Sequence, residues 1–287
     1  MFIRSYEYLK PTIDKIDHYE IDGISRDGYA TSEYINLTNK IILDRNTAVL
    51  YAGGAGIGQS ESRDGSQVSD RVRGTVDLQK STMLIKELSA YNLHKWIGEM
   101  ENNHLVKYAN INHNTCASSI HALYEAEQLL KRDDIDEVVV ISEERTSFNT
   151  IRIFKEHAIP LVVGDGLVVM RLWKEDGIEI SDCKWVYEWN RNPFGVTVSG
   201  YATVDSPEVK TVKVHGTGTE NNTAGESVLM EGRTVVKYKD KIGHTQGTSG
   251  ILELCMVLED ETVVGDVLCV ASGLGGFYGS CILHKIK

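Results

Sequence analysis

Short runs rich in Val, Ile and Leu recur along the chain and predict buried β-strands. Apolar residues at three- and four-residue steps between them predict helices, most clearly over residues 117–131, where Ile120, Leu123, Ala126 and Leu130 share one face. Further helical segments are predicted over residues 225–230 and 248–258. The predicted strands are residues 46–51, 105–112, 137–141, 161–163, 167–172, 178–189, 209–215, 234–238, 267–271 and 279–284.

Strands that alternate with helices in this way imply a mixed, layered α/β fold. The two halves of the chain repeat the order strand, helix, strand, and no low-complexity linker divides them. The strongest cluster of turn-forming residues, 190–195, is short and lies between segments that look structured. We therefore expect one compact unit built from two similar halves.

Composition narrows the class of protein. The 287 residues are 41% hydrophobic and 25% charged, which is ordinary for a globular chain with room for a large core. The net charge of −11 and the lack of a basic run argue against nucleic acid as a partner. No apolar run approaches the ~20 residues that cross a bilayer, and the N-terminal segment does not resemble a signal peptide.

The five cysteines indicate the compartment. Their number is odd and no Cys-x-x-Cys spacing occurs, which argues against a disulfide framework and against a zinc site. We expect a reduced, cytoplasmic protein.

A glycine-rich segment at residues 53–58 follows one predicted strand and invites two functional interpretations. The dinucleotide-binding spacing fails because its third glycine position is Gln59. The nucleophile-elbow spacing around Ser60 fails because Ser62 stands where the last glycine belongs. A tight turn between closely packed backbones is the simpler interpretation.

Cys116 joins a predicted strand directly to a predicted helix. A thiol in the first turn of a helix faces unpaired N–H groups and the positive end of the helix dipole, which lower its pKa. The same N–H groups can bind an oxyanion. The alternative, a small buried core residue, fits the other four cysteines better. Cys116 is therefore a candidate nucleophile.

Two histidines share a second distinctive setting. His215 and His244 each lie in a stretch of Gly and Thr, beside a Val-rich strand or before a helix. A single histidine in such a place is more often structural, but two in the same setting favour a site.

Four blocks of sequence carry a family resemblance: residues 115–119, 215–219, 243–250 and 273–276, with Lys239 before the third. In this order they resemble the β-ketoacyl-acyl-carrier-protein synthases, or ketosynthases, of the thiolase superfamily. The resemblance covers the chain from about residue 105 onward, and the first hundred residues match in general pattern only. It implies a thiolase-like α/β fold with α-β-α-β-α layers and two fused pseudo-symmetric halves, residues 1–155 with the cysteine and residues 156–287 with both histidines.

The resemblance also implies a reaction in polyketide or fatty-acid-like biosynthesis. Cys116 would carry an acyl group as a thioester, and a malonyl thioester would lose carbon dioxide and attack that group as an enolate. Neutral His215 and His244 would donate hydrogen bonds to the enolate, and the backbone N–H groups of Cys116 and Leu274 would form the oxyanion hole. No metal and no cofactor is expected.

Further residues take supporting roles by the same resemblance. Lys239 is expected to pair with Glu226, although a solvated lysine is an equal alternative. The substrate-binding residues implied are Thr217, Thr219, Gly275 and Gly276.

The sequence also departs from the family pattern. Thr223 stands where an aspartate is common, and Leu274 replaces an aromatic residue that controls entry to the pocket. Only 99 positions separate Cys116 from His215, and 29 separate His215 from His244, which is shorter than is usual in the family.

An acyl carrier protein is the implied partner, docking on basic residues such as Lys131, Arg132 and the group at 237–241. The resemblance also implies a homodimer, or a heterodimer with another ketosynthase-like subunit, formed through the strand at 105–112. Two alternatives stay open: an acyltransferase that does not decarboxylate, and a non-catalytic subunit like a chain length factor.

Overall fold

A computed structural model describes residues 1–15, 18–22, 41–53, 78–144, 146, 151, 155, 161–189 and 195–285, with side chains from residue 89 onward in the segment 78–144. Most of the glycine-rich segment at 53–58, with Gln59 and Ser60, lies outside the described residues. So does most of the turn cluster at 190–195.

A ten-stranded sheet organises the described residues. In spatial order its strands are β11 (Thr234–Val236), β10 (Thr211–Lys213), β12 (Gly265–Gly273), β13 (Phe277–Lys285), β9 (Ile178–Tyr187), β1 (Phe2–Leu9), β8 (Gly166–Trp173), β6 (Glu137–Glu144), β4 (Thr47–Gly53) and β5 (Val106–Asn112). A small second sheet contains β2 (Ile13–Asp14), β3 (His18–Glu20) and β7 (Val163–Gly164).

The large sheet repeats one topology twice. In chain order the five strands of the first half are β1, β4, β5, β6 and β8. Across the sheet, from its edge inward, they stand in the order third, second, fourth, fifth and first. Strands β9 to β13 of the second half stand in the same order. Strand directions repeat as well, since β4 is parallel to β5 and β6 as β10 is to β11 and β12. The expected pair of fused pseudo-symmetric halves is therefore confirmed.

The two sets of five strands meet where β1 runs antiparallel to β9, with Ile3 opposite Ile178. The division after residue 155 stays a prediction. The strand repeat offers another position for it, between β8 and β9.

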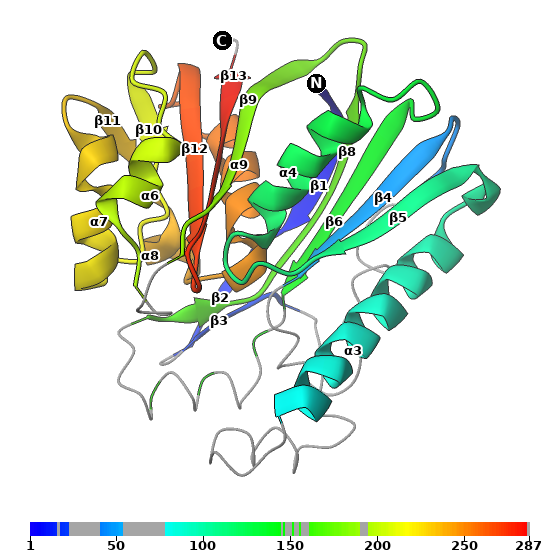
Figure 1. The fold of residues 1–287 in the computed structure, drawn as a ribbon, viewed down its shortest axis with the longest axis horizontal. Coiled ribbons are helices and arrows are strands. Elements are labelled where there is room, and N and C mark those ends of the chain that lie inside the picture. The colour runs from blue at the N-terminus through cyan, green and yellow to red at the C-terminus, as the bar shows by residue number, and fades with distance from the viewer. Residues whose placement is uncertain are drawn as a thin grey trace.

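Helices complete five layers (Figure 1). Helices α4 (Ser118–Leu129) and α9 (Ser249–Glu259) pack against each other between the two halves of the sheet. Helix α3 (Leu78–Glu99) covers the outer face of β4 and β5, while α6 (Val198–Thr203) and α7 (Glu220–Met230) cover the opposite outer face. This is the α-β-α-β-α arrangement that the sequence led us to expect.

Side chains that alternate along one strand serve two different cores. In β6, Val138 and Val140 belong to the central core around α4 and α9, whereas Val139 and Ile141 face the core beneath α3. A strand with a helix on each face is buried on both, so its sequence is a continuous apolar run. The apolar runs were therefore reliable signals for the central strands.

Several elements carry weaker signals and were not predicted. They include α3, α6, the short helix α8 (Lys239–Ile242), and strands β1 to β3. In β1, charged and aromatic residues are mixed, and the strand depends on partners distant in sequence: the Arg4 guanidinium contacts Glu137 at 3.0 Å. Among the helices that the structure describes, none combines the length and the apolar character needed to cross a membrane.

The close approach of α4 and α9 generates the first prediction. A Cβ added at Gly250 would lie 2.5 Å from Cγ1 of Ile120 and 2.9 Å from Oγ of Ser119. We expect Gly250→Ala to lower the free energy of unfolding by about 1–3 kcal/mol, the usual cost of overpacking a core. Urea denaturation followed by circular dichroism measures it.

Gly98 in α3 provides the matched control, because a Cβ there meets nothing within 4 Å. Gly98→Ala should leave stability unchanged or raise it by up to about 1 kcal/mol, because alanine favours the helical backbone of this last turn over glycine. Equal behaviour of the two variants would contradict the tight contact between α4 and α9.

Candidate active site

Cys116 lies in the turn between β5 and α4, two residues before the helix begins at Ser118. The preceding residue, Thr115, has a φ of 52°, in the left-handed region that a β-branched residue adopts only at a cost. The surroundings hold this conformation: Ser118 Oγ donates to the Thr115 carbonyl at 2.6 Å, and Thr115 Oγ1 donates to the Leu274 carbonyl at 3.2 Å. The resulting sharp turn fixes the position of the cysteine.

The glycine-rich turn between β12 and β13 packs directly against the Cys116 turn. A Cβ at Gly273 would lie 2.3 Å from Thr115 Oγ1, so any side chain there would displace the turn that carries the cysteine. Leu274 follows and is 45% exposed. Gly275 and Gly276 complete the turn with φ of 95° and 86°. The backbone expected to form an oxyanion hole therefore lies beside Cys116, and the role itself stays a prediction.

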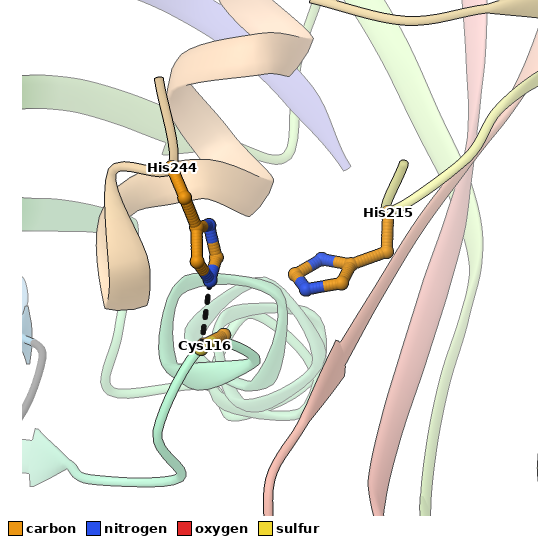
Figure 2. Close-up of side chains that lie close together, drawn as sticks. All are labelled: Cys116, His215 and His244. Carbon is orange, nitrogen blue, oxygen red and sulfur yellow. Dashed lines mark hydrogen bonds between the residues drawn. The ribbon is translucent and has the colours of Figure 1, made fainter. Parts of the chain in front are cut away.

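His244 faces the cysteine from the second half of the chain. Its Nε2 lies 3.1 Å from Cys116 Sγ (Figure 2). Its Nδ1 lies 3.1 Å from Ser249 Oγ, at the start of α9. The His244 backbone is fixed as well, since its N–H donates to the Val162 carbonyl at 2.6 Å and its carbonyl accepts from Gly164. Both ring nitrogens thus have defined partners.

His215 approaches the same point from the end of β10 (Figure 2). Its ring is nearly perpendicular to that of His244, with centroids 5.2 Å apart. The Cys116 sulfur and one ring nitrogen from each of His215 and His244 all lie within 4.8 Å of one another. His215 Nδ1 is buried and has no hydrogen-bond partner among the described residues. An unpaired buried polar atom is uncommon in folded proteins, and it sets His215 apart from His244.

Both imidazoles are neutral at pH 7. Burial lowers the pKa of His215 and of His244 well below the usual 6.5, and the Lys239 ammonium lowers both further. Since the charged form is disfavoured, protonation requires a pH well below the usual value. A neutral imidazole keeps one N–H group, which can donate a hydrogen bond to developing negative charge.

The thiol differs from the sequence-based expectation. Burial raises the pKa of Cys116 to about 12, an effect larger than the lowering by Lys239 and by a backbone N–H. The expected lowering by a helix N-terminus is therefore wrong, because α4 begins two residues later and the site is desolvated. The thiol is protonated at rest and needs a base when it reacts.

Lys239 and Glu226 do not pair with each other as expected. Lys239 is buried in α8, and its Nζ donates to Glu253 of α9. Glu226 instead accepts from the Gly216 N–H at 2.9 Å and from Asn222 Nδ2 at 2.7 Å. It therefore fixes the loop that follows His215. The alternative of a solvated Lys239 is wrong as well.

Three polar residues near the site escaped the sequence reasoning: Lys213, Ser249 and Glu253. Lys213 is fully buried, and its Nζ contacts Glu253 Oε2 and the Val270 carbonyl, each at 3.0 Å. The signal was present, because a charged residue interrupts an apolar strand at Lys213 and an apolar helix at Glu253. Buried charges of this kind require partners that only the tertiary structure identifies.

Thr217 and Thr219 lie in the loop after His215, with their Oγ1 atoms 3.2 Å apart. Both are half-buried. Their substrate-binding role stays a prediction.

Comparison with solved structures places this geometry in a known fold, although the sequence matches no protein-family model and no curated protein. The AntDE:AntF complex, a type II PKS acyl-carrier protein with its ketosynthase bound to the hexaketide, matches with a TM-score of 0.72 and 12% identity. The match covers 100% of this chain and 99% of that chain.

Two further solved structures match the chain in fold. A beta-ketoacyl synthase from Burkholderia phymatum STM815 matches with a TM-score of 0.64 and 14% identity, over 94% of this chain and 88% of that one. The ketosynthase ApeO in complex with its chain length factor ApeC, from Xenorhabdus doucetiae, matches with a TM-score of 0.58 and 18% identity, over 84% and 75%. The chain has the thiolase-like fold that ketosynthases and chain length factors share.

Proposed function

We propose that this chain is a β-ketoacyl synthase that condenses a malonyl thioester, with loss of carbon dioxide, onto an acyl group carried by Cys116. The observation that carries the proposal is the position of the thiol on its sharp turn, 3.1 Å from His244 Nε2 and close to the neutral imidazole of His215. A nucleophile, a base within hydrogen-bond distance and a second hydrogen-bond donor meet there.

In the loading step, His244 Nε2 accepts the thiol proton as Cys116 Sγ attacks the carbonyl of an acyl thioester. The proton then passes to the departing thiolate of the carrier, so that the acyl group remains on Cys116. During this step Ser249 Oγ accepts a hydrogen bond from His244 Nδ1–H. The backbone N–H groups of Cys116 and Leu274 would stabilise the tetrahedral oxyanion.

In the condensation step the malonyl carboxylate leaves as carbon dioxide, and its bonding electrons form an enolate on the remaining thioester. His215 and His244 donate N–H groups to the enolate oxygen. This needs the proton of His244 on Nε2, with Ser249 now donating to Nδ1. A hydroxyl both donates and accepts, so Ser249 supports the two tautomers in turn. The enolate carbon attacks the acyl carbonyl, the thioester bond to Cys116 breaks, and the released thiolate takes up a proton from water, which restores the resting thiol.

Partners follow from the fold. Strand β5 is at one end of the ten-stranded sheet, and an edge strand offers backbone groups to a second subunit. Neighbouring structures contain a carrier protein or a chain length factor beside a ketosynthase. We infer an acyl carrier protein as the donor and a homodimer or heterodimer as the working form. A cytoplasmic location stays a prediction from cysteine usage.

Two other functions share this fold. A chain length factor would complete a heterodimer without catalysis, and neighbouring structures include such subunits. A transfer-only enzyme would load Cys116 and pass the acyl group on without decarboxylation. The placement of Cys116 beside His244 favours a catalytic role over that of a chain length factor. The presence of a second histidine at the site favours a decarboxylating enzyme over a transfer-only one.

Covalent loading tests the nucleophile. Incubation with an acyl thioester should add one acyl mass to the intact protein, and Cys116→Ala should abolish it because no other described thiol faces both histidines. Cys183→Ala is the matched control and should load as the unaltered protein does. Mass spectrometry of the intact chain and of its peptides reads the result. Loading that persists in Cys116→Ala would refute the proposal.

Carbon dioxide release from a malonyl thioester tests the histidines. We expect His215→Ala to slow release by about 10²–10³, the usual effect of removing one hydrogen bond to a developing oxyanion. Loading of Cys116 should stay within a few-fold of normal, because His244 remains. The release is measured by labelling the free carboxylate of the malonyl thioester and capturing the radiolabelled carbon dioxide as bicarbonate. Loading without any release in the unaltered protein would identify a transfer-only enzyme, and neither activity would identify a chain length factor.

The raised pKa of Cys116 predicts an unusual pH profile. Alkylation of Cys116 by iodoacetamide should accelerate about tenfold per pH unit from about pH 7 to pH 9.5 without levelling off, because the thiolate stays a minor species below its pKa of about 12. Free cysteine in the same buffer levels off near its pKa of about 8.5 and serves as control. A plateau below that pH would indicate a preformed thiolate–imidazolium pair instead.

A further inference from the structure

A buried arrangement of three charged side chains includes Lys213, two residues before His215, and Lys239, five residues before His244. Glu253 lies almost fully buried in the centre of α9. One of its carboxylate oxygens accepts from Lys239 Nζ, and the other accepts from Lys213 Nζ at 3.0 Å. Lys213 and Lys239 therefore share one carboxylate, and we call these three residues the buried triad.

The charge balance of the buried triad is uneven. Two ammonium groups and one carboxylate leave an excess of one positive charge in a region without solvent. This excess acts on the active site, because Lys213 and Lys239 each lower the pKa of His215 and of His244. In a medium of low dielectric constant such an interaction is strong.

Other ionisable groups lie near the site. Burial raises the pKa of Glu226 of α7, and both lysines of the triad oppose this rise. Glu144, at the end of β6, raises the pKa of Cys116. The Cys116 thiol itself faces His244. Lys213 is thus one of a limited set of groups that determine the field at the site.

We propose that Lys213 is a positioning residue for the reaction at Cys116, since by sharing Glu253 it gives the buried triad its positive excess and so favours negative charge at the histidines. This inference rests on the proposed function. Lys213 does not touch the substrate in this scheme. It acts through Glu253 and the two histidines, which stay neutral donors while the malonyl carboxylate and the enolate carry the negative charge.

The position does not require a charge for structural reasons. Strand β10 already has a parallel strand on each side, with Lys213 opposite Val236 and Cys269. Well-packed apolar residues replace buried ion pairs at little cost in many proteins, whereas a buried ammonium loses its hydration. Because an apolar side chain would satisfy the sheet, the charge of Lys213 points to the site that it faces.

The test compares Lys213→Met with Lys213→Arg. The methionine variant leaves one ammonium and one carboxylate, so the positive excess disappears, whereas the arginine variant keeps it. We expect the turnover rate of carbon dioxide release to fall about tenfold or more in Lys213→Met with KM nearly unchanged, since the field acts on the transition state. Lys213→Arg should keep most of the activity.

The acid side of the pH profile gives the readout that a merely structural role would not move. Removal of a neighbouring positive charge raises the pKa of both imidazoles, so they protonate at higher pH. The acid limb of carbon dioxide release should therefore move to higher pH in Lys213→Met and stay in place in Lys213→Arg. An acid limb that moves equally in both variants would overturn the inference.

A measurement without turnover separates this inference from the proposed function. Imidazole NMR signals of His215 and His244, followed from about pH 4 to 8, should titrate at higher pH in Lys213→Met than in the unaltered protein. The shifted titration is expected even if the protein releases no carbon dioxide. A lack of release would refute the proposed synthase activity alone. Identical titration in folded protein would refute the role of Lys213 alone. If Lys213→Met does not fold, Lys213→Arg decides: it keeps the charge, so a shifted titration in it contradicts the proposal.

Discussion

The site depends on one strained turn being held in place by contacts from the other half of the chain. Thr115 adopts a left-handed backbone that a β-branched residue avoids, and the turn after β12 stabilises it. Gly273 allows the two turns to approach so closely that no side chain fits between them. Strain at a single residue is affordable only where surrounding contacts determine the backbone. The position of Cys116 is therefore a property of both halves together.

The repeated topology explains why the site lies where it does. Each half brings a helix to the middle layer, where α4 and α9 meet between the two sets of strands. The cysteine precedes the first of these helices, and His244 lies in the segment that leads to the second. Duplicated architecture thus places the two segments that precede the central helices side by side. His215 completes the group from the end of β10, a strand of the second half.

Burial determines the chemical state of the site. It raises the pKa of Cys116 and lowers that of both histidines, so all three groups are neutral at rest. Negative charge that develops there meets N–H donors and the positive excess of Lys213 and Lys239 over Glu253, rather than water. A neutral resting state next to a positively biased interior suits a reaction whose intermediates are anions. The same burial makes each charged residue dependent on its partner.

The sequence by itself determined the layered α/β class and the central strands and helices, and it singled out the three candidate residues that the structure brings together. These follow from local patterns: apolar runs for strands buried on both faces, helical periodicity over residues 117–131, and reactive side chains among small residues at strand ends. Tertiary structure alone decided the partner of Lys239, the burial of Lys213 and the pKa of Cys116. An ion pair between α8 and α9 joins side chains 14 positions apart, and desolvation depends on what covers a group in space. Neither is encoded in the spacing of residues along the chain.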